Sequence, residues 1–128
     1  MGEYFGVMRK ENLLDLDNRK GKAPGGYCTE YPFQRLPFIF MNAVGTHSDV
    51  QTMIHEGGHA FHVFESAELP FSSQRDVGME FAEVASMAME LLASPYLTVD
   101  NGGFYTDKES SRARIEHLEK IIMFWPYM

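Results

Sequence analysis

The chain has 128 residues, a net charge of −7, a hydrophobic content of 45% and one cysteine. This length suits a single domain with a modest core, the apolar content excludes a disordered chain, and the acidic charge argues against nucleic acid or an anionic membrane as a partner. With no internal disulfide available to Cys28, no signal peptide and no apolar run near the ~20 residues that span a bilayer, we expect a soluble cytoplasmic protein.

The N-terminal third is predicted to contain a helix, a loop and two strands. Apolar residues near helical spacing predict a helix over Glu3–Asp17. A loop rich in Gly, Pro and Asn follows at 18–26. Short apolar and aromatic runs predict strands at Tyr27–Thr29 and Phe38–Met41, which a turn region separates. The two strands would form a short hairpin ahead of the next helix.

The second of these strands is predicted to lie at the edge of its sheet. Pro37 stands at its start, and proline is typical of edge strands because it cannot donate a backbone hydrogen bond. An edge strand at this place can bind an extended peptide by backbone pairing, with Phe40, Met41 and Asn42 as the contacting residues. The alternative is a purely structural hairpin that covers the following helix.

The next helix is predicted within the stretch Thr46–Phe64. Ser48 is a good N-cap, and Gln51 three residues later completes a capping box. Several apolar residues give this helix a surface to bury. Gly57 and Gly58 each cost about 1 kcal/mol relative to alanine inside a helix. We therefore expect another element to approach the backbone closely at these two glycines.

This helix carries the pattern with the most specific chemistry, His-Glu-Gly-Gly-His at 55–59. His55 and His59 lie four residues apart on one helix face, so both imidazoles can reach one zinc ion at about 2.0–2.1 Å. Glu56 points about 100° around the helix, where it can act on a water at the metal without replacing that water. The pattern predicts two metal ligands and a general base. The alternative is a set of ordinary polar residues on an amphipathic helix.

A second long helix is predicted over Arg75–Ser94, where Pro95 ends it. Small residues along it allow another helix to pack closely. Its apolar stripe, which we expect to be buried, consists of Val77, Phe81, Val84, Ala88 and Leu91.

A catalytic zinc commonly has three protein ligands and one open position, so a third ligand is needed. Metzincins place a glycine and a histidine shortly after the second motif histidine, but His62 and Glu65 occupy those positions here. A carboxylate from the following helix is the remaining choice. Glu80, Glu83 and Glu90 are the candidates, and Glu83 has the most apolar and small-residue surroundings.

A third helix is predicted to begin at a capping box formed by Thr106 and Glu109 and to extend to about Trp125. Its predicted core positions are Ala113, Ile115, Leu118, Ile121 and Ile122. Residues 121–128 are largely apolar, and nothing follows to cover them. We therefore expect this end of the helix to favour association into a homo-oligomer.

Five segments carry a family pattern: G-K-A-P-G-G-Y-C-T (21–29), P-F-I-F-M-N (37–42), H-E-G-G-H-A-F (55–61), E-F-A-E-V-A-S (80–86) and E-H-L-E-K-I-I-M-F-W-P (116–126). In this order, they resemble the zinc oligopeptidases of the oligoendopeptidase F and thimet oligopeptidase type. Members of that family have several hundred residues. The resemblance therefore implies that residues 1–128 form one segment of a catalytic domain, truncated at both ends.

The resemblance implies a mainly α fold of the zincin-like, gluzincin type, in which the zinc helix packs on a second, Glu-bearing helix and a third C-terminal helix beside a two-stranded edge hairpin. It implies one Zn²⁺ per chain, held by His55, His59 and Glu83, with Glu56 as the general base. The implied activity is hydrolysis of short peptides by metal-activated water. Glu90 is expected either to hydrogen-bond a zinc histidine or to lie on a solvated helix face.

Two alternative hypotheses use the same residues. In the first, the chain is a catalytically incomplete fragment or an assembly module, with a structural zinc closed by a fourth ligand such as His62 or Glu65. In the second, the chain is a metal-free helical bundle. The tyrosine and histidine that stabilise the tetrahedral intermediate in the family correspond to no residue of this chain. We therefore expect the isolated chain to be a weak peptidase or inactive.

Overall fold

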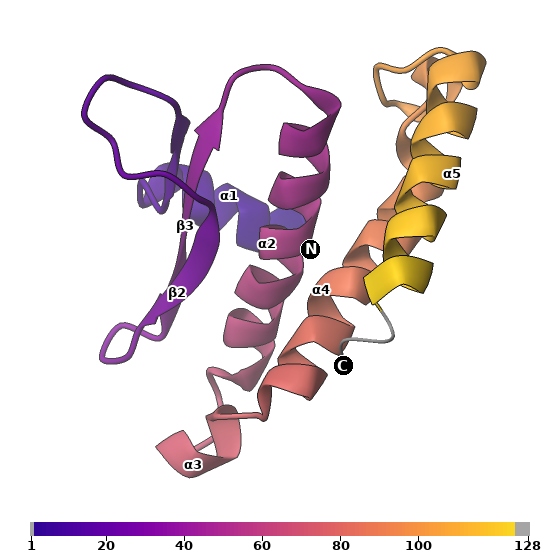
Figure 1. Cartoon of the computed structure of the whole chain (residues 1–128). Helices are drawn as coiled ribbons and strands as arrows, with labels where there is room; N and C mark the ends of the chain where they lie inside the picture. Colours follow the sequence, from indigo (N-terminus) through magenta and orange to yellow (C-terminus); the bar gives the residue numbers. More distant parts are fainter. Residues whose placement is uncertain (1, 125–128) are drawn as a thin grey trace. The chain divides into compact units, whose positions relative to one another are not determined.

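The computed structural model describes residues 2–124 and divides the chain into two compact units, one ending at Glu90 and one beginning at Leu91 (Figure 1). The first unit contains α1 (Gly2–Lys10), β1 (Leu14–Asp17), β2 (Tyr27–Tyr31), β3 (Leu36–Ala43), α2 (His47–Ser66), α3 (Ser72–Arg75) and most of α4 (Met79–Ala93). The second contains the end of α4, the 3-10 turns η1 (Ser94–Tyr96) and η2 (Val99–Asn101), and α5 (Asp107–Phe124). The fold is mainly helical with one small sheet, as predicted. None of the described helices has the combination of length and apolar character needed to cross a membrane.

The N-terminal helix ends earlier than predicted, at Lys10. Asn12 has a left-handed backbone with a φ of 55°, which interrupts a right-handed helix, and Leu13 then enters the core. The next residues form β1, and the Ile39 amide donates a hydrogen bond of 3.0 Å to the Leu13 carbonyl. The prediction of one helix over Glu3–Asp17 is therefore wrong in its second half, because pairing with a distant strand outweighs local helical periodicity.

Strand β3 lies at the centre of a three-stranded sheet, with β1 parallel on one side and β2 antiparallel on the other. Both predicted strands are present and pair as the predicted hairpin. The prediction that the second strand lies at the edge is wrong, because β1 adds a third strand to the sheet. Pro37 explains the error, because β1 pairs with β3 only from Ile39 onwards and the proline precedes the doubly paired part. The Phe40 backbone is paired on both sides, so β3 has no free edge there for a peptide.

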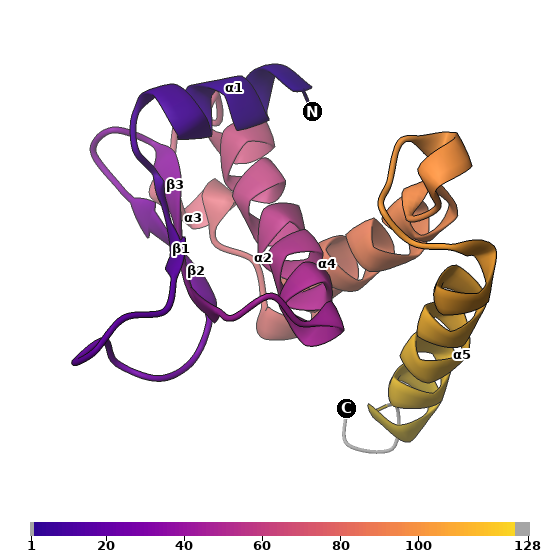
Figure 2. The same cartoon turned by 90° about the horizontal axis from the view of Figure 1, so that it is seen from above.

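Helix α2 packs against β2 and β3 on one face of the sheet, and α1 lies beside α2 (Figure 2). Tyr4 of α1 stacks on Phe64 of α2 with ring centroids 4.6 Å apart, and its hydroxyl donates to Glu65 at 2.9 Å. The sheet and α1 thus support α2, the helix that carries the histidine motif. The buried core of this unit consists of Met8, Leu13, Ile39, Met41 and Ala60.

The N-terminus of α2 has the predicted kind of cap in a different register. Thr46 is the N-cap instead of Ser48, and Asp49 closes the capping box instead of Gln51. Asp49 Oδ2 accepts from the Thr46 amide at 2.7 Å, and Thr46 Oγ accepts from the Asp49 amide at 3.4 Å. Both pairs have the same spacing in the sequence. The carboxylate of Asp49 has the additional advantage of facing the positive end of the helix dipole.

The loop at 18–26 is tied to the sheet by polar side chains. The Lys22 side chain is 1% exposed, and its ammonium donates to the Asp15 carbonyl at 3.0 Å and to the Asp15 carboxylate at 3.1 Å. Asn42 Nδ2 of β3 donates to the carbonyls of Ala23 and Gly25 at 2.8 Å each. These bonds hold the loop in place where it leads into β2.

We expect Asp15→Asn to reduce the sensitivity of the fold to acid. Hydrogen bonds from Arg19 and Lys22 lower the pKa of Asp15 to about 2, from an ordinary value of 3.8. Because the folded-state pKa is the lower one, the carboxylate stabilises the fold above the ordinary value, and this contribution is lost as the pH falls toward the folded-state pKa. Urea unfolding at about pH 6 and about pH 2.5 should show a smaller loss of stability in Asp15→Asn than in the unaltered chain. Asp100→Asn, on an exposed turn, is the control, and equal losses in all three proteins would contradict the prediction.

The predicted second long helix, Arg75–Ser94, is present but begins later than predicted. Helix α3 ends at Arg75, and α4 begins at Met79. Asp76 caps α3 with an extended backbone at φ −82° and ψ 118°, so the chain leaves the helix there. The glutamates proposed as ligands therefore lie on a separate helix, α4, with its own direction.

The apolar stripe predicted to be the core face of α4 is largely exposed. Phe81 is 76% exposed, Val84 59% and Leu91 48%. The buried position of α4 is Ser86, which is 0% exposed. Residues 81 and 84 lie roughly 140–160° around the helix from residue 86. The prediction is wrong because α2, the neighbour of α4 in this unit, approaches the small-residue face and leaves the bulky face uncovered.

Helix α5 of the second unit begins at the predicted capping box. The Thr106 amide donates to Glu109 Oε2 at 2.9 Å, and the Glu109 amide donates to Thr106 Oγ at 3.3 Å. The turn before this helix has Gly102 in a left-handed conformation at φ 90°. The predicted capping box is therefore confirmed.

The predicted core face of α5 is only partly right. Ala113 is buried, but the large residues Ile115, Leu118 and Ile122 are 60%, 51% and 69% exposed. The other buried positions are Ser110 and His117, which with Ala113 follow a helical spacing of three and four residues. The last part of the apolar terminus, Trp125–Met128, lies outside the described residues. Self-association through this helix stays a prediction.

Candidate metal centre

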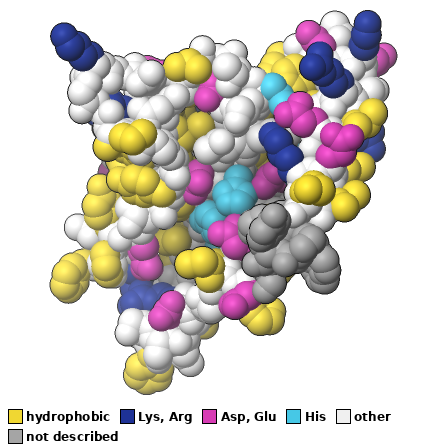
Figure 3. All heavy atoms as spheres, in the orientation of Figure 1, with side chains coloured by type: hydrophobic (Ala, Val, Ile, Leu, Met, Phe, Trp, Pro, Cys, Tyr) yellow, Lys and Arg dark blue, Asp and Glu magenta, His cyan; other side chains and the backbone are white. Residues whose placement is uncertain are grey.

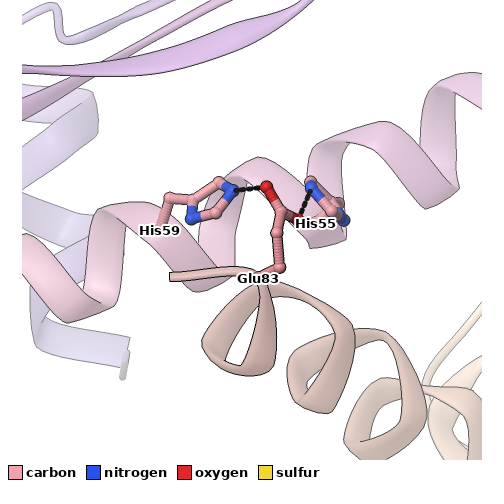
Figure 4. Close-up of side chains that lie close together, drawn as sticks. All are labelled: His55, His59 and Glu83. Carbon is pink, nitrogen blue, oxygen red and sulfur yellow. Dashed lines mark ion pairs between the residues drawn. The ribbon is translucent and has the colours of Figure 1, made fainter. Parts of the chain in front are cut away.

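His55, His59 and Glu83 converge between α2 and α4 (Figure 4). One potential ligand atom of each residue lies within 4.8 Å of the others. The Glu83 carboxylate rises from α4 between the two imidazoles, with Oε2 3.2 Å from His55 Nε2 and Oε1 3.7 Å from His59 Nε2. The three side chains are 20–27% exposed. The space-filling view shows histidine and acidic side chains next to one another at the surface (Figure 3).

The donor set and its spacing suit a zinc ion. Two ligand atoms at about 2.0–2.1 Å from zinc, at a tetrahedral angle, are about 3.4 Å apart. The separations of 3.2 Å from His55 to Oε2 and 3.7 Å from His59 to Oε1 are close to this value, and one ligand atom of each residue lies within 4.8 Å of the others. Two imidazoles and one carboxylate also leave a fourth position for water or substrate, which is the arrangement of catalytic zinc sites. The residues present therefore fit this metal.

Glu90 contacts the other ring nitrogen of His55. His55 Nδ1 and Glu90 Oε1 are 2.7 Å apart, and the Glu90 side chain is 13% exposed. Because an ionised carboxylate only accepts hydrogen bonds, Glu90 favours the neutral tautomer of His55 that carries its proton on Nδ1, and in that tautomer Nε2 has its lone pair on the side of Glu83. Of the two alternatives for Glu90, the structure thus shows the hydrogen bond to a motif histidine and not a solvated face.

The pKa values of the two histidines are shifted in opposite directions. The hydrogen bond to Glu90 raises the pKa of His55, whereas burial lowers the pKa of His59. A metal binds the neutral imidazole, so protons compete with a metal more strongly at His55 than at His59.

Helix α4 comes close enough to α2 because α2 has a glycine at the crossing point. A Cβ atom on Gly58 would lie 2.6 Å from Ser86 Cα and 2.8 Å from the Ala85 carbonyl oxygen. A Cβ on Gly57 would have no neighbour within 4 Å. The predicted close approach is thus confirmed for Gly58 and wrong for Gly57. The contact at Gly58 sets the helix separation at which Glu83 reaches both histidines.

Ser86 is the one residue near the site whose role the sequence reasoning missed, since only close packing was expected of it. Its Oγ lies 3.0 Å from Glu83 Oε2. The signal that could have found it is a serine among Ala82, Ala85 and Ala88. Alanine is the better helix former, and a buried hydroxyl requires a partner.

Glu56 lies on the side of α2 that faces the sheet and is 7% exposed. Glu56 is close enough to Cys28 of β2, a free thiol, to affect the pKa of that thiol. Burial raises the pKa of Cys28 to about 12, and the negative charge of Glu56 adds to this rise. The carboxylate of Glu56 is thus close to β2, while the two motif histidines face α4.

The other candidate ligands lie elsewhere. Within residues 2–124, the group of potential ligand atoms does not include His62, Glu65 or Glu80. Glu80 is exposed on α4, and Glu65 accepts a hydrogen bond from the Tyr4 hydroxyl at 2.9 Å. A closed four-ligand structural site therefore has no support in the described part of the chain.

The three residues predicted to contact substrate have structural partners. Phe40 stacks on Tyr27 with ring centroids 5.0 Å apart, Met41 is 2% exposed, and Asn42 anchors the neighbouring loop. Met41 and Asn42 also line an open hollow of about 290 Å³ together with Thr52 of α2. Contact of these residues with a substrate stays a prediction.

Comparison with known proteins places the chain in a family. The model of peptidase family M3 matches residues 3–125. Oligopeptidase PepF of Bacillus subtilis (strain 168) is 30% identical over 101 residues, which cover 76% of this chain and 15% of that protein. The oligoendopeptidase F homolog of Mycoplasma genitalium is 33% identical over 97 residues, which cover 73% of this chain and 16% of that protein. A solved structure of PZ peptidase A with an inhibitor has a TM-score of 0.86 and 36% identity, and the match covers 98% of this chain and 22% of that one.

The matched range contains the histidine motif and the glutamate helix, and the fold agrees with that of the solved PZ peptidase A. These features are characteristic of a family of metallopeptidases. The chain belongs to peptidase family M3. The family that the sequence segments resemble is thereby confirmed. The chain spans 15–22% of the lengths of the three relatives named above.

Proposed function

We propose that this chain is the zinc-binding catalytic segment of an oligopeptidase that hydrolyses peptide bonds in short peptides. His55, His59 and Glu83 are the proposed zinc ligands, and Glu56 is the proposed general base. The observation that carries this proposal is the convergence of these three ligand atoms within 4.8 Å, from two helices, in a chain of peptidase family M3.

The chemistry follows from the donor set. A zinc ion held by the three ligands would supply a Lewis acid for the scissile carbonyl and would make a bound water more acidic. Glu56 would accept the proton of the attacking water and deliver it to the leaving amine. Glu90 would hold the His55 ring through Nδ1, so that Nε2 stays available as a ligand.

The edge of β2 is the proposed place for an extended peptide. In the described part of the chain, β2 pairs only with β3, and it packs beside α2. Cys28 of β2 is close enough to Glu56 for the charge of that residue to affect its pKa. A peptide paired with the outer edge of β2 would therefore pass near the general base. This edge, Tyr27–Tyr31, replaces Phe38–Met41 as the proposed peptide-binding strand.

A catalytically incomplete zinc-binding segment is the second candidate function. This candidate is supported by the apolar face of α4 that carries Phe81 and Val84, whose side chains are 76% and 59% exposed. Such a face is usually buried against a partner. The relatives are also several times longer than this chain. In this second case the chain would bind zinc in the same way but would need further protein to complete the site that stabilises the transition state.

Glu56→Gln separates metal binding from catalysis. We expect the unaltered chain to bind one zinc ion per molecule and Glu56→Gln to bind zinc equally well, because Glu56 is not among the proposed ligands. Hydrolysis of a fluorogenic peptide should fall by about 10²–10⁴-fold in the variant, because the proton acceptor is lost. Metal content is measured by elemental analysis after gel filtration of both proteins, and Glu68→Gln, on the exposed surface, is the matched control.

The outcomes distinguish the candidates. Loss of zinc in Glu56→Gln would make Glu56 a ligand and would overturn its assignment as the base. Full zinc content with no measurable hydrolysis by the unaltered chain would favour the incomplete segment. An unaltered chain that binds no zinc at neutral pH would overturn both.

A further inference from the structure

A fully buried hydroxyl lies at the point where α2 and α4 touch. Ser86 is 0% exposed, and its backbone lies against Gly58. Serine is less favourable than alanine in a helix interior, and a buried hydroxyl without a partner destabilises the fold. Ala82, Ala85 and Ala88 lie within four residues of it on α4. If packing were its only role, alanine would be the more favourable residue at this position.

The Ser86 hydroxyl has two acceptors, both on Glu83. Its Oγ lies 2.9 Å from the Glu83 carbonyl oxygen and 3.0 Å from the Glu83 carboxylate oxygen Oε2. A hydroxyl has one proton, and a charged acceptor forms the stronger bond. Ser66 of α2 shows the ordinary case for comparison, since its Oγ donates at 3.2 Å to the carbonyl three residues earlier, on Val63. Ser86 differs from Ser66 in its additional contact with a carboxylate.

This contact bears on the orientation of the Glu83 carboxylate. Oε2 is also 3.2 Å from His55 Nε2, while Oε1 is 3.7 Å from His59 Nε2. The last torsion of a glutamate side chain has a broad minimum, so the packing of the chain does not by itself set how the two oxygens are turned. A donor fixed on the same helix, one turn later, does set it. The backbone contact with Gly58 keeps this donor from moving away.

We propose that Ser86 is a positioning residue for Glu83, whose carboxylate it holds so that one oxygen accepts the hydroxyl and the carboxylate binds the metal in a single orientation. This inference rests on the proposed zinc site. It predicts that the hydroxyl affects the metal and not only the fold.

The test compares Ser86→Ala with Ser66→Ala. Both variants lose a buried or half-buried hydroxyl that bonds to a carbonyl three residues earlier, but only Ser86→Ala loses a carboxylate contact. Zinc dissociation constants are measured by competition with a chromophoric chelator. We expect the constant to rise about 10–100-fold for Ser86→Ala, as for other residues that orient a metal ligand. For Ser66→Ala it should stay within about twofold.

A second measurement separates positioning from simple stability. The chain is loaded fully with Co²⁺, and its visible absorption is recorded, because this absorption depends on the number and geometry of the ligands. Ser86→Ala should show changed band positions or intensity, and Ser66→Ala should match the unaltered chain. Urea unfolding of the metal-free variants checks that both remain folded, and alanine at either position favours the helix.

Two results would overturn the inference. One is a zinc affinity of Ser86→Ala within twofold of the unaltered chain. The other is a lower affinity with an unchanged Co²⁺ spectrum, which would mean that Ser86 acts on stability alone. Failure of the proposed function gives a different result, because the unaltered chain itself would then bind neither ion.

Discussion

Glu83→Ala is expected to lower zinc affinity by more than about 100-fold, because a lost ligand should cost more than a lost orienting partner. Glu83 provides the only carboxylate that the structure places between the two motif histidines in the described residues. Its removal leaves two imidazoles, which do not form a stable zinc site in water. The affinity is measured by chelator competition at constant pH, since metal binding releases protons.

Glu80→Ala is the matched control for this prediction. Glu80 is on the same helix, three residues earlier, and is exposed. The same change of side chain there should alter zinc affinity by about twofold or less. Glu90→Ala should lie between the two, with a loss of about 10–100-fold, because Glu90 orients His55 and is not itself a proposed ligand. A larger loss in Glu80→Ala than in Glu83→Ala would show that the ligand assignment is wrong.

Gly58→Ala is expected to have the largest effect on the fold of the first unit. The new Cβ would lie 2.6 Å from Ser86 Cα, so one of the two helices must shift. Overpacking of this kind costs about 1–3 kcal/mol of unfolding free energy. Because the shift moves α4 away from α2, zinc affinity should fall as well. Urea unfolding of the metal-free chain and zinc titration measure the two effects.

Gly57→Ala is the control, with the same change one residue earlier on the same helix. A Cβ there meets nothing within 4 Å, so the variant should gain about 0.5–1 kcal/mol of stability from the better helix propensity of alanine. Zinc affinity should stay unchanged. Equal behaviour of the two variants would mean that the α2–α4 contact does not depend on Gly58.

For α4, the helix itself was predicted correctly, but the face predicted to be buried is exposed. Phe81 and Val84 have the spacing of a buried stripe, and they belong to one by every local criterion. In this chain the partner of α4 in its unit is α2, which meets the face of Ser86. Periodicity shows that a helix has an apolar face but not whether the neighbour that covers that face is present.

Local patterns in the sequence by themselves determined the motif helix, the capping box of α5 and the third helix. His55 and His59 share a face because the helix repeat is 3.6 residues, whatever surrounds them. Thr106 and Glu109 cap α5 because both hydrogen bonds close within one turn. The family was also evident from the chain alone, since five ordered segments carry its residues.

Tertiary structure alone decided which distant segments meet. Leu14–Asp17 forms a strand because it pairs with β3, about 25 residues away in the sequence. The spacing of apolar residues within one segment does not indicate such a contact. The order of the strands, which puts β3 at the centre, follows from that same pairing. The choice of Glu83 among three glutamates depends on where α4 crosses α2, and Gly58 and Ser86 set that crossing. Such contacts join residues far apart in the chain, so they depend on the shape and packing of whole elements and not on the spacing within one of them.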